Sequence, residues 1–288
     1  MQIGIILIIV TILCWGFGDF FIQKSTRKMG DWESLFIITA FGFVILSPLV
    51  LSDIWEIFVD FRSLLILLVG GLIMFIAALI DFEALKKGKL AIIEPVWSTE
   101  IIVSVLLALF ILGETTGILQ IILILTLMIG LVLVSLKSEH FHGKNWIEKG
   151  VLLALLAALL MGVANFFLGW GSRETDALVA NWVFNFVMAF GSLVYLIYNK
   201  RIRKLGRDIF RNKKLTLSMI VLDNTAWIAF AFAMTFSNIG IVVALTESYI
   251  VIAVLLGVFV NKEYLRMHQK IGVAIAVASA IALSFFIG

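Results

Sequence analysis

Long, almost uncharged apolar stretches recur along the whole chain and constrain its fold more than any other feature. A helix needs about 20 predominantly apolar residues to cross the hydrocarbon core of a bilayer. This template fits ten stretches, at residues 3–23, 34–51, 64–85, 90–112, 117–136, 149–170, 178–198, 214–236, 240–260 and 267–287. The sequence therefore predicts an all-α membrane protein with ten transmembrane helices.

The composition supports this fold class. Of the 288 residues, 62% are hydrophobic and 14% are charged, whereas soluble domains are about half apolar and a quarter charged. The apolar stretches are continuous, unlike the alternating strands of outer-membrane barrels. The first stretch has no Lys or Arg before Lys24 and no small-residue cleavage pattern, so we interpret it as a span and not as a removed signal peptide. The single cysteine, Cys14, leaves the redox compartment open.

Basic residues gather in alternate gaps between the predicted spans. The first, third, fifth, seventh and ninth gaps contain 20 of the 22 Lys and Arg residues, and the other gaps contain only Arg62 and Arg173. Because Lys and Arg accumulate in cytoplasmic loops, this pattern predicts a multi-pass cell-membrane protein with both termini outside the cytoplasm. The basic seventh gap could also bind anionic lipid headgroups. Such short basic gaps do not indicate a nucleic-acid surface.

Two related halves are visible when the chain is compared with itself. A shift of 146 residues lays Gly16–Phe21 over Gly162–Phe167, and a shift of 149 residues lays Gln120 over Gln269. Five helices per half would make the halves insert in opposite senses, and the basic gaps change sides between the halves as this requires. Inverted repeats are typical of transporters that bind solute near the midplane. The predicted repeats are residues 1–140 and 141–288.

Residues near the ends of the two halves carry a family resemblance. Pro95-Val96 is followed by Gly113-Glu114 before the fifth stretch, while Ala244 and Lys262-Glu263 stand at the matching places of the second half. With ten helices in two halves, the chain resembles the EamA type of the drug/metabolite transporter superfamily. The resemblance implies a secondary carrier, often an exporter, with a cavity lined by helices one, three, four, six, eight and nine. It implies cytoplasmic termini for many members, opposite to the charge-based orientation.

Polar and ionisable groups at membrane depth are costly, which makes them candidates for function. Glu100 and Glu247 lie near the centres of the fourth and ninth stretches, and Asp223 lies midway along the eighth. Facing a cavity, these acids could trade a proton for a cationic or zwitterionic solute, with Glu100 and Glu247 as coupling sites. They could instead hydrogen-bond neighbouring helices and hold the bundle together. Asp19 and Asn165, at equivalent places in the first and sixth stretches, join the predicted substrate-binding set.

Aromatic residues beside these acids complete the predicted pocket. Trp97, Trp227 and Tyr249 each lie within four residues of one of the acids. Aromatic faces attract organic cations, although core packing explains any one of these residues equally well. Asn181 and Asn185 share a stripe of the seventh stretch, where we expect helix packing, with a role in lining a path as the alternative.

The remaining polar groups favour less specific interpretations. Asp81 and Glu83 come shortly before Lys86 and Lys87, which predicts surface ion pairs. The histidines form no constellation with cysteines or carboxylates, so the sequence predicts no metal site and no cofactor.

Three classes of function are compatible with a polytopic membrane protein. The favoured hypothesis is a secondary active transporter that exports a small organic solute by alternating access, coupled to protons or by exchange. An integral-membrane enzyme or lipid-handling protein is the alternative, but the chain has no HExxH, GxSxG or P-loop motif. A channel is disfavoured because no filter-like loop is repeated within the spans. The expected partners are the solute, protons and membrane lipids, with no nucleic acid, and the oligomeric state stays open.

Overall fold

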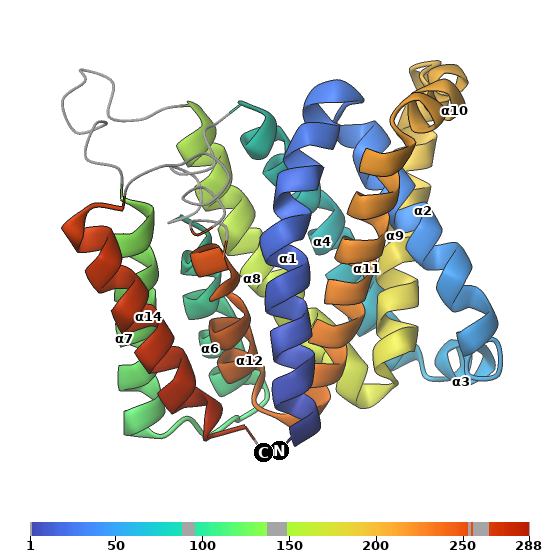
Figure 1. Ribbon diagram of the computed structural model, residues 1–288. Helices are drawn as coiled ribbons and strands as arrows, with labels where there is room; N and C mark the ends of the chain where they lie inside the picture. Colours follow the sequence, from blue (N-terminus) through green and yellow to red (C-terminus); the bar gives the residue numbers. More distant parts are fainter. Residues whose placement is uncertain (1, 88–95, 137–148, 253–254, 256–264, 288) are drawn as a thin grey trace.

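The structure is a computed structural model that describes residues 2–87, 96–136, 149–252, 255 and 265–287. The regular secondary structure of these ranges is α-helical (Figure 1). The helices are α1 (Gln2–Lys28), α2 (Asp31–Val50), α3 (Ile54–Val59), α4 (Phe61–Lys87), α6 (Thr99–Ile111), α7 (Ile118–Ser135), α8 (Lys149–Glu174), α9 (Ala177–Tyr198), α10 (Ile202–Arg211), α11 (Lys213–Phe236), α12 (Ile239–Thr246) and α14 (Met267–Ser284).

Seven of the described helices are long and apolar enough to cross a membrane, namely α1, α2, α4, α8, α9, α11 and α14. They coincide with seven of the predicted spans. Shorter apolar helices stand at the predicted fourth, fifth and ninth spans, where α6, α7 and α12 lie. The all-α membrane fold is therefore confirmed. The count of ten spans stays a prediction, because the fourth and ninth predicted spans extend into residues outside the described ranges.

In helix α1, both the exposed face and the buried face are apolar. Ile6, Ile9 and Leu13 recur at spacings of three and four and are exposed, whereas Ile8 and Trp15 are buried. Both faces are apolar, because lipid is as hydrophobic as the protein interior and provides no drive to bury one face over the other. Close packing between helices decides which face turns inward.

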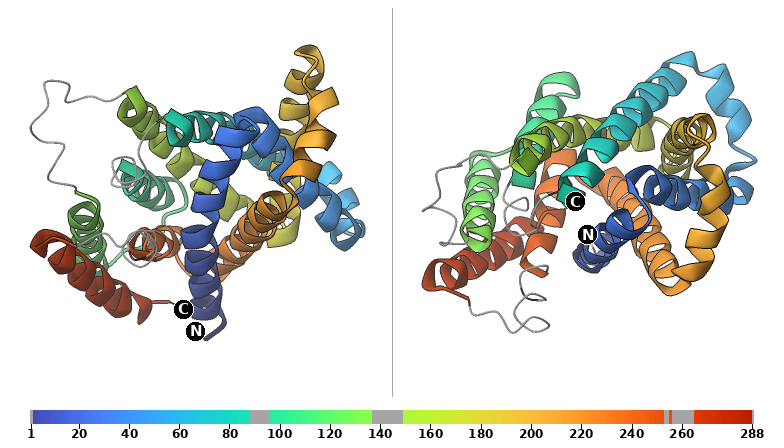
Figure 2. Two further views of the ribbon diagram at one scale, coloured as in Figure 1. Left: turned by 45° about the horizontal axis from the view of Figure 1, so that its top comes forward. Right: turned by 90° about the horizontal axis from the view of Figure 1, so that it is seen from above.

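The two halves of the chain are interleaved, and their helices pair according to a twofold relationship. The second, fourth and fifth predicted spans each pack on their own repeat counterpart, as α2 on α9, α6 on α12 and α7 on α14. The first and third spans exchange partners, as α1 packs on α11 and α4 on α8. Seen from above in Figure 2, α7 and α14 form one edge of the bundle, well separated from α2 and α9.

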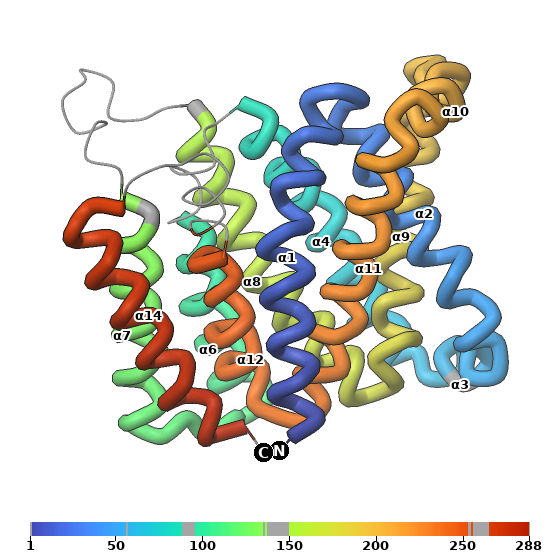
Figure 3. The backbone as a smooth tube through the Cα atoms, in the orientation of Figure 1, coloured from blue at the N-terminus to red at the C-terminus, as the bar shows by residue number. Residues whose placement is uncertain are grey.

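The backbone path confirms that the repeats are inverted. In Figure 3, α1 runs away from the face that holds both ends of the chain, whereas its counterpart α8 runs towards that face. The ends of α1 and α4, the region around α10 and the start of α14 lie at the opposite face, which we call the basic face because these segments carry most of the Lys and Arg residues. The face with the chain ends is called the termini face. Arg62, near the start of α4, and Arg173, near the end of α8, belong to the termini face.

One crossing between the two halves is built twice in the same way. Gly16 of α1 lies against Ile252, and a Cβ atom at Gly16 would come within 2.8 Å of the Ile252 Cβ. Its counterpart Gly162 of α8 lies against Val103, at 2.7 Å from the Val103 Cβ. Val103 and Ile252 are themselves related by the shift of 149 residues, so the contact obeys the internal repeat. The predicted boundary between residues 140 and 141 lies outside the described residues and stays a prediction.

We expect the crossing of α7 and α14 to tolerate no side chain at Gly130. A Cβ atom there would lie 2.7 Å from the Ala276 backbone nitrogen, whereas a Cβ atom at Gly206 in α10 meets nothing within 4 Å. Gly130→Ala should therefore lower the thermal unfolding temperature of the purified protein. Gly206→Ala should leave this temperature unchanged or raise it, because Ala favours a helix over Gly by about 1 kcal/mol. Equal shifts in the two variants would contradict this packing.

Candidate functional site

A cavity lies between the two halves and is lined by residues of both. The side chains come from α1, α2, α4, α6, α8, α9 and α11, from Trp97 before α6, and from Glu247 and Tyr249 after α12. The space among them is about 980 Å³, including the part that is open to solvent. The helices that the family resemblance implied all contribute, and the second and seventh spans, α2 and α9, contribute as well.

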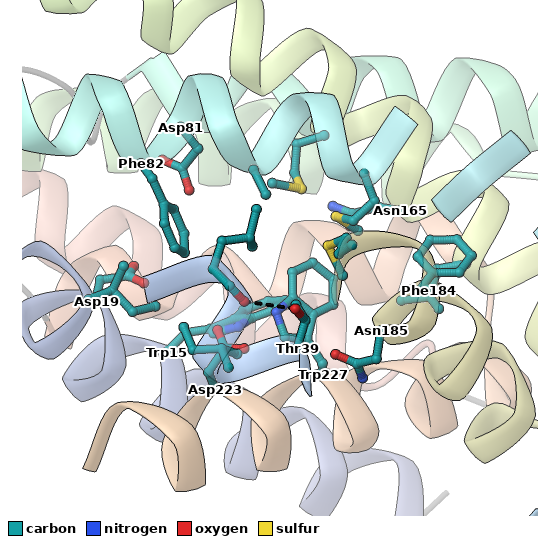
Figure 4. Close-up of a pocket in the computed structure, with 18 of the residues that line it drawn as sticks. Trp15, Asp19, Thr39, Asp81, Phe82, Asn165, Phe184, Asn185, Asp223 and Trp227 are labelled. Carbon is teal, nitrogen blue, oxygen red and sulfur yellow. Dashed lines mark hydrogen bonds between the residues drawn. The ribbon is translucent and has the colours of Figure 1, made fainter. Parts of the chain in front are cut away.

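The cavity wall is acidic. Five carboxyl groups line it, from Asp19, Asp81, Glu100, Asp223 and Glu247, and its described lining contains no Lys, Arg or His. The close-up in Figure 4 shows the three aspartates arranged around one space, from α1, α4 and α11. A cleft with one sign of charge and low-dielectric walls concentrates ions of the opposite sign. The cavity is therefore suited to cations.

Glu100 and Glu247 meet at the centre of the structure. Their carboxyl groups hydrogen-bond to each other, which requires that one of them carries a proton, since an ionised carboxylate only accepts. The Asn165 Nδ2 atom donates to the Glu100 Oε1 atom at 3.0 Å. The Glu247 Oε2 and Asn165 Oδ1 atoms are buried without a hydrogen-bond partner among the described residues. Buried polar atoms are normally paired, so both oxygens are available to accept a hydrogen bond from a solute, and the Glu247 carboxyl oxygen can also bind a proton.

A second polar contact is the repeat counterpart of the contact between Asn165 and Glu100. Tyr249 hydrogen-bonds to Asp19, and these residues are the repeat counterparts of Glu100 and Asn165, respectively. Each crossing thus joins one carboxyl group of the first half to one neutral partner of the second half. The acid lies on the first span at one crossing and on the fourth span at the other. Glu100 and Glu247 occupy corresponding spans but are not counterparts, since Glu247 corresponds to Ser98.

Both segments that carry these glutamates contain a tightened turn within a helical path. A turn at Ser98 precedes α6, and a turn at Glu247-Ser248 follows α12 before the helix resumes at residues 249–252. Ser98 and Glu247 are 149 residues apart, so the two turns are repeat counterparts. The backbone at both turns keeps right-handed helical dihedrals, with φ and ψ of −56° and −14° at Ser98 and of −59° and −14° at Glu247, and Ile239–Ile252 forms one apolar helical segment. The described residues therefore do not contradict the helices predicted at 90–112 and 240–260. A short tightened turn within a helix often marks a functional hinge.

Aromatic side chains pack against one another beside the cavity. The ring of Trp15 lies 5.1 Å from Trp227, 5.0 Å from Phe230 and 6.0 Å from Tyr249, measured between ring centroids. Trp227 also hydrogen-bonds to Asp223, one helical turn before it. The cluster thus joins the acidic wall to a tightly packed aromatic layer.

All eight residues predicted for the substrate-binding set line this one cavity. They are Asp19, Trp97, Glu100, Asn165, Asp223, Trp227, Glu247 and Tyr249. Asn181 and Asn185 line it as well, while the amide nitrogen of Asn181 also donates to the carbonyl oxygens of Ala177 and Trp227. Both interpretations considered for this asparagine stripe therefore apply to Asn181.

Asp81 and Trp15 are among the lining residues that the sequence analysis missed. The predicted surface pairing is confirmed for Glu83, which contacts Lys86 and Lys87, and Asp81 lines the cavity. Residues two apart on a helix point to nearly opposite sides, a signal that could have separated the two acids. Trp15 stands one turn before Asp19, at the same spacing that joins Asp223 to Trp227.

Other sequence expectations lie outside this site. Pro95, His140, His142 and the Lys262-Glu263 pair fall outside the described residues. The third histidine, His268, contacts the Leu136 carbonyl oxygen at 2.8 Å through its Nε2 atom. Within the described ranges, no group of three or more His, Cys, Asp or Glu residues is placed to hold a metal ion.

Comparison with known proteins gives a consistent result. The model of the EamA-like transporter family matches residues 2–136 and again residues 148–285. A relative from Methanocaldococcus jannaschii, named uncharacterized protein MJ1333.1, is 26% identical over 138 residues, which is 48% of this chain and the whole of that protein. That relative thus has the length of one repeat.

A crystal structure of a protein that is 18% identical superimposes with a TM-score of 0.74 over 98% of this chain and 96% of the other, and shares the fold. Both halves of this multi-pass membrane chain match the same transporter model, and the protein belongs to the EamA-like transporter family.

Proposed function

We propose that this protein is a secondary active transporter that exports a small organic cation, or an amino-acid-like zwitterion, in exchange for protons. The observation that carries the proposal is the wall of five carboxyl groups with no basic residue among its described members. An anionic solute would be repelled by such a wall. A neutral solute would leave the acids with no role that offsets the cost of placing them at membrane depth.

The contact between Glu100 and Glu247 supports proton coupling. The proton that this hydrogen bond requires must leave if both carboxylates are to face a cation, and it must return when the cation departs. One site that holds either a proton or a solute, but not both, is the simplest basis for exchange. Asp19 and Asp223, with Trp97, Trp227 and Tyr249, would surround the organic part of the solute, where aromatic rings favour cations.

The charge distribution supports an orientation in the cell membrane. Basic segments remain in the cytoplasm, so we place the basic face inside the cell and both termini outside. Asp19 and Ile22 of α1 and the lining residues of α2 lie in the halves of these helices nearer to the basic face. Solute loading from the cytoplasm, and hence export, agrees with the position of these residues.

Removing either central carboxyl group should abolish the coupling of flux to protons. In Glu100→Gln the amide oxygen can still accept the hydrogen bond of Asn165, so the fold should persist while the exchangeable proton is lost. We expect proton-driven flux to fall by about tenfold or more in Glu100→Gln and in Glu247→Gln, because hydrogen bonds to charged groups contribute about 1.5–3 kcal/mol. The measurement is solute flux into proteoliposomes with a pH-sensitive dye inside.

Glu83→Gln provides the matched control, since Glu83 pairs with Lys86 and Lys87 outside the cavity. Its flux and its pH dependence should equal those of the wild type. Unchanged flux with unchanged pH dependence in both cavity variants would show that neither glutamate couples transport to protons.

The solute preference should follow charge more than shape. For an amine and an uncharged compound of similar shape, we expect binding of the cation to stabilise the purified protein against thermal unfolding, because a ligand that binds only the folded state raises its stability. The uncharged compound should give a much smaller shift. A preference for anions, or equal shifts for both members of several such pairs, would overturn the cation proposal.

A further inference from the structure

The two arginines that depart from the charge pattern, Arg62 and Arg173, both connect the two halves of the chain at the termini face. The Arg62 guanidinium lies 3.5 Å from the Glu174 carboxylate and over the Trp170 ring, 5.8 Å from its centroid. Arg62 belongs to the first half, and its partners belong to α8 of the second. This arginine bridge is exposed, and exposed ion pairs contribute little on their own.

Arg173 makes a more extensive bridge. Its Nη1 atom donates to the Glu114 Oε1 atom at 2.6 Å, and its Nε and Nη2 atoms donate to the carbonyl oxygens of Met234 and Ser237 at 2.8 and 2.6 Å. The Glu114 side chain is only 9% exposed, so the ion pair is shielded on one side. One guanidinium thereby joins α8, the end of α11 and the segment that precedes α7. Its planar fork suits several acceptors at once.

Glu114 is held in place for this contact by the backbone around it. Gly113 has a φ of +66°, a left-handed conformation that glycine adopts at no steric cost, and the Glu114 nitrogen donates back to the Ala108 carbonyl oxygen at 3.1 Å. The Glu114 carboxylate also accepts from the Ile239 backbone nitrogen at the start of α12, at 3.1 Å. Thus Glu114 touches two segments of the second half while belonging to the first.

A neighbouring hydrogen bond closes the same seam. The Asn238 Nδ2 atom donates to the Thr115 carbonyl oxygen at 3.1 Å. On the basic face, Arg201 of the second half lies 3.5 Å from Glu33 of the first half. That pair lies at the outer edge of the bundle, between the end of α9 and the start of α2.

We propose that Arg173 and Glu114, assisted by Arg62, form a latch that holds the cavity closed on the termini face, and that this latch must open for solute to leave on that side. The proposal rests on the alternating-access part of the proposed function and does not depend on the identity of the solute. The acidic cavity then faces the basic side while the latch is closed. Opening requires that residues 113–115 separate from Arg173 and from residues 237–239, which breaks the contacts of Glu114 and Thr115 described above.

Thiol labelling tests the latch without any solute. In a Cys14→Ser background, Leu168→Cys places one thiol at a buried cavity position five residues before Arg173. A membrane-impermeant maleimide is added from the termini face of intact vesicles. Arg173→Gln and Glu114→Gln should each raise the labelling rate. The rise should be roughly tenfold if the loss of the ion pair stabilises the open state by about 1.4 kcal/mol relative to the closed state. The two changes combined should add little to either one, because they remove the same ion pair.

Arg203→Gln is the matched control, since it removes an exposed arginine of α10 on the basic face. Equal labelling in the wild type and in both latch variants would overturn the proposal. An equal rise in Arg203→Gln would also overturn it, because the effect would then reflect general loosening. Arg173→Lys should give an intermediate rate, since an ammonium group keeps the charge but cannot reproduce the planar fork.

If the latch variants fold poorly, a reversible cross-link tests whether the seam must open for transport. Thr115→Cys with Asn238→Cys, again in the Cys14→Ser background, places two thiols across the seam. Formation of the disulfide should stop transport, and reduction should restore it to the level of the uncross-linked protein. Continued transport with the disulfide formed would show that this seam does not open. The labelling result stands whatever the solute is, so failure of the cation proposal and failure of the latch can be told apart.

Discussion

Placing five carboxyl groups at membrane depth is the constraint on which the rest of this structure depends. A bilayer offers them neither water nor counter-ions, so each acid must face a shared polar space or a hydrogen-bond donor. The structure provides both, because the acids line one cavity, and Asn165, Trp227 and Tyr249 donate to three of them. The paired helices, the segments with tightened turns at Ser98 and Glu247 and the aromatic layer all contribute residues to the cavity wall.

The internal repeat explains how a short chain builds such a site. The same crossing is made twice, with Gly16 and Gly162 allowing two spans to approach the segments with tightened turns. The side chains at the two crossings differ, since one crossing pairs Asp19 with Tyr249 and the other pairs Glu100 with Asn165, so that both acids belong to the first half. A symmetric framework can adopt two mirrored states of similar energy, and unequal side chains then determine which state is preferred. The placement of both of these acids in the first half is one such asymmetry.

Much of the fold could be predicted from the sequence, because membrane spans follow hydropathy and basic gaps follow topology. The depth of Glu100, Glu247 and Asp223 in apolar stretches was enough to place them at a common site. The tightened turns at Ser98 and Glu247 could not be predicted, because a hydropathy pattern carries no information on local backbone geometry. Asp81 was assigned to the surface because lysines follow it closely, although its helix face points to the cavity. The short helix α10 was overlooked, because its basic residues were interpreted only as a signal of orientation.

The central claim is that protons and a cationic solute compete for the same carboxyl groups. Its most direct test is proton release on binding, measured with a pH indicator in a weakly buffered solution of the purified protein as an organic cation is added. Competition predicts that saturating the cavity releases protons, and that the apparent affinity for the cation weakens as the pH falls. Saturable binding of a cation with no proton release, over the whole pH range in which the protein remains folded, would contradict it.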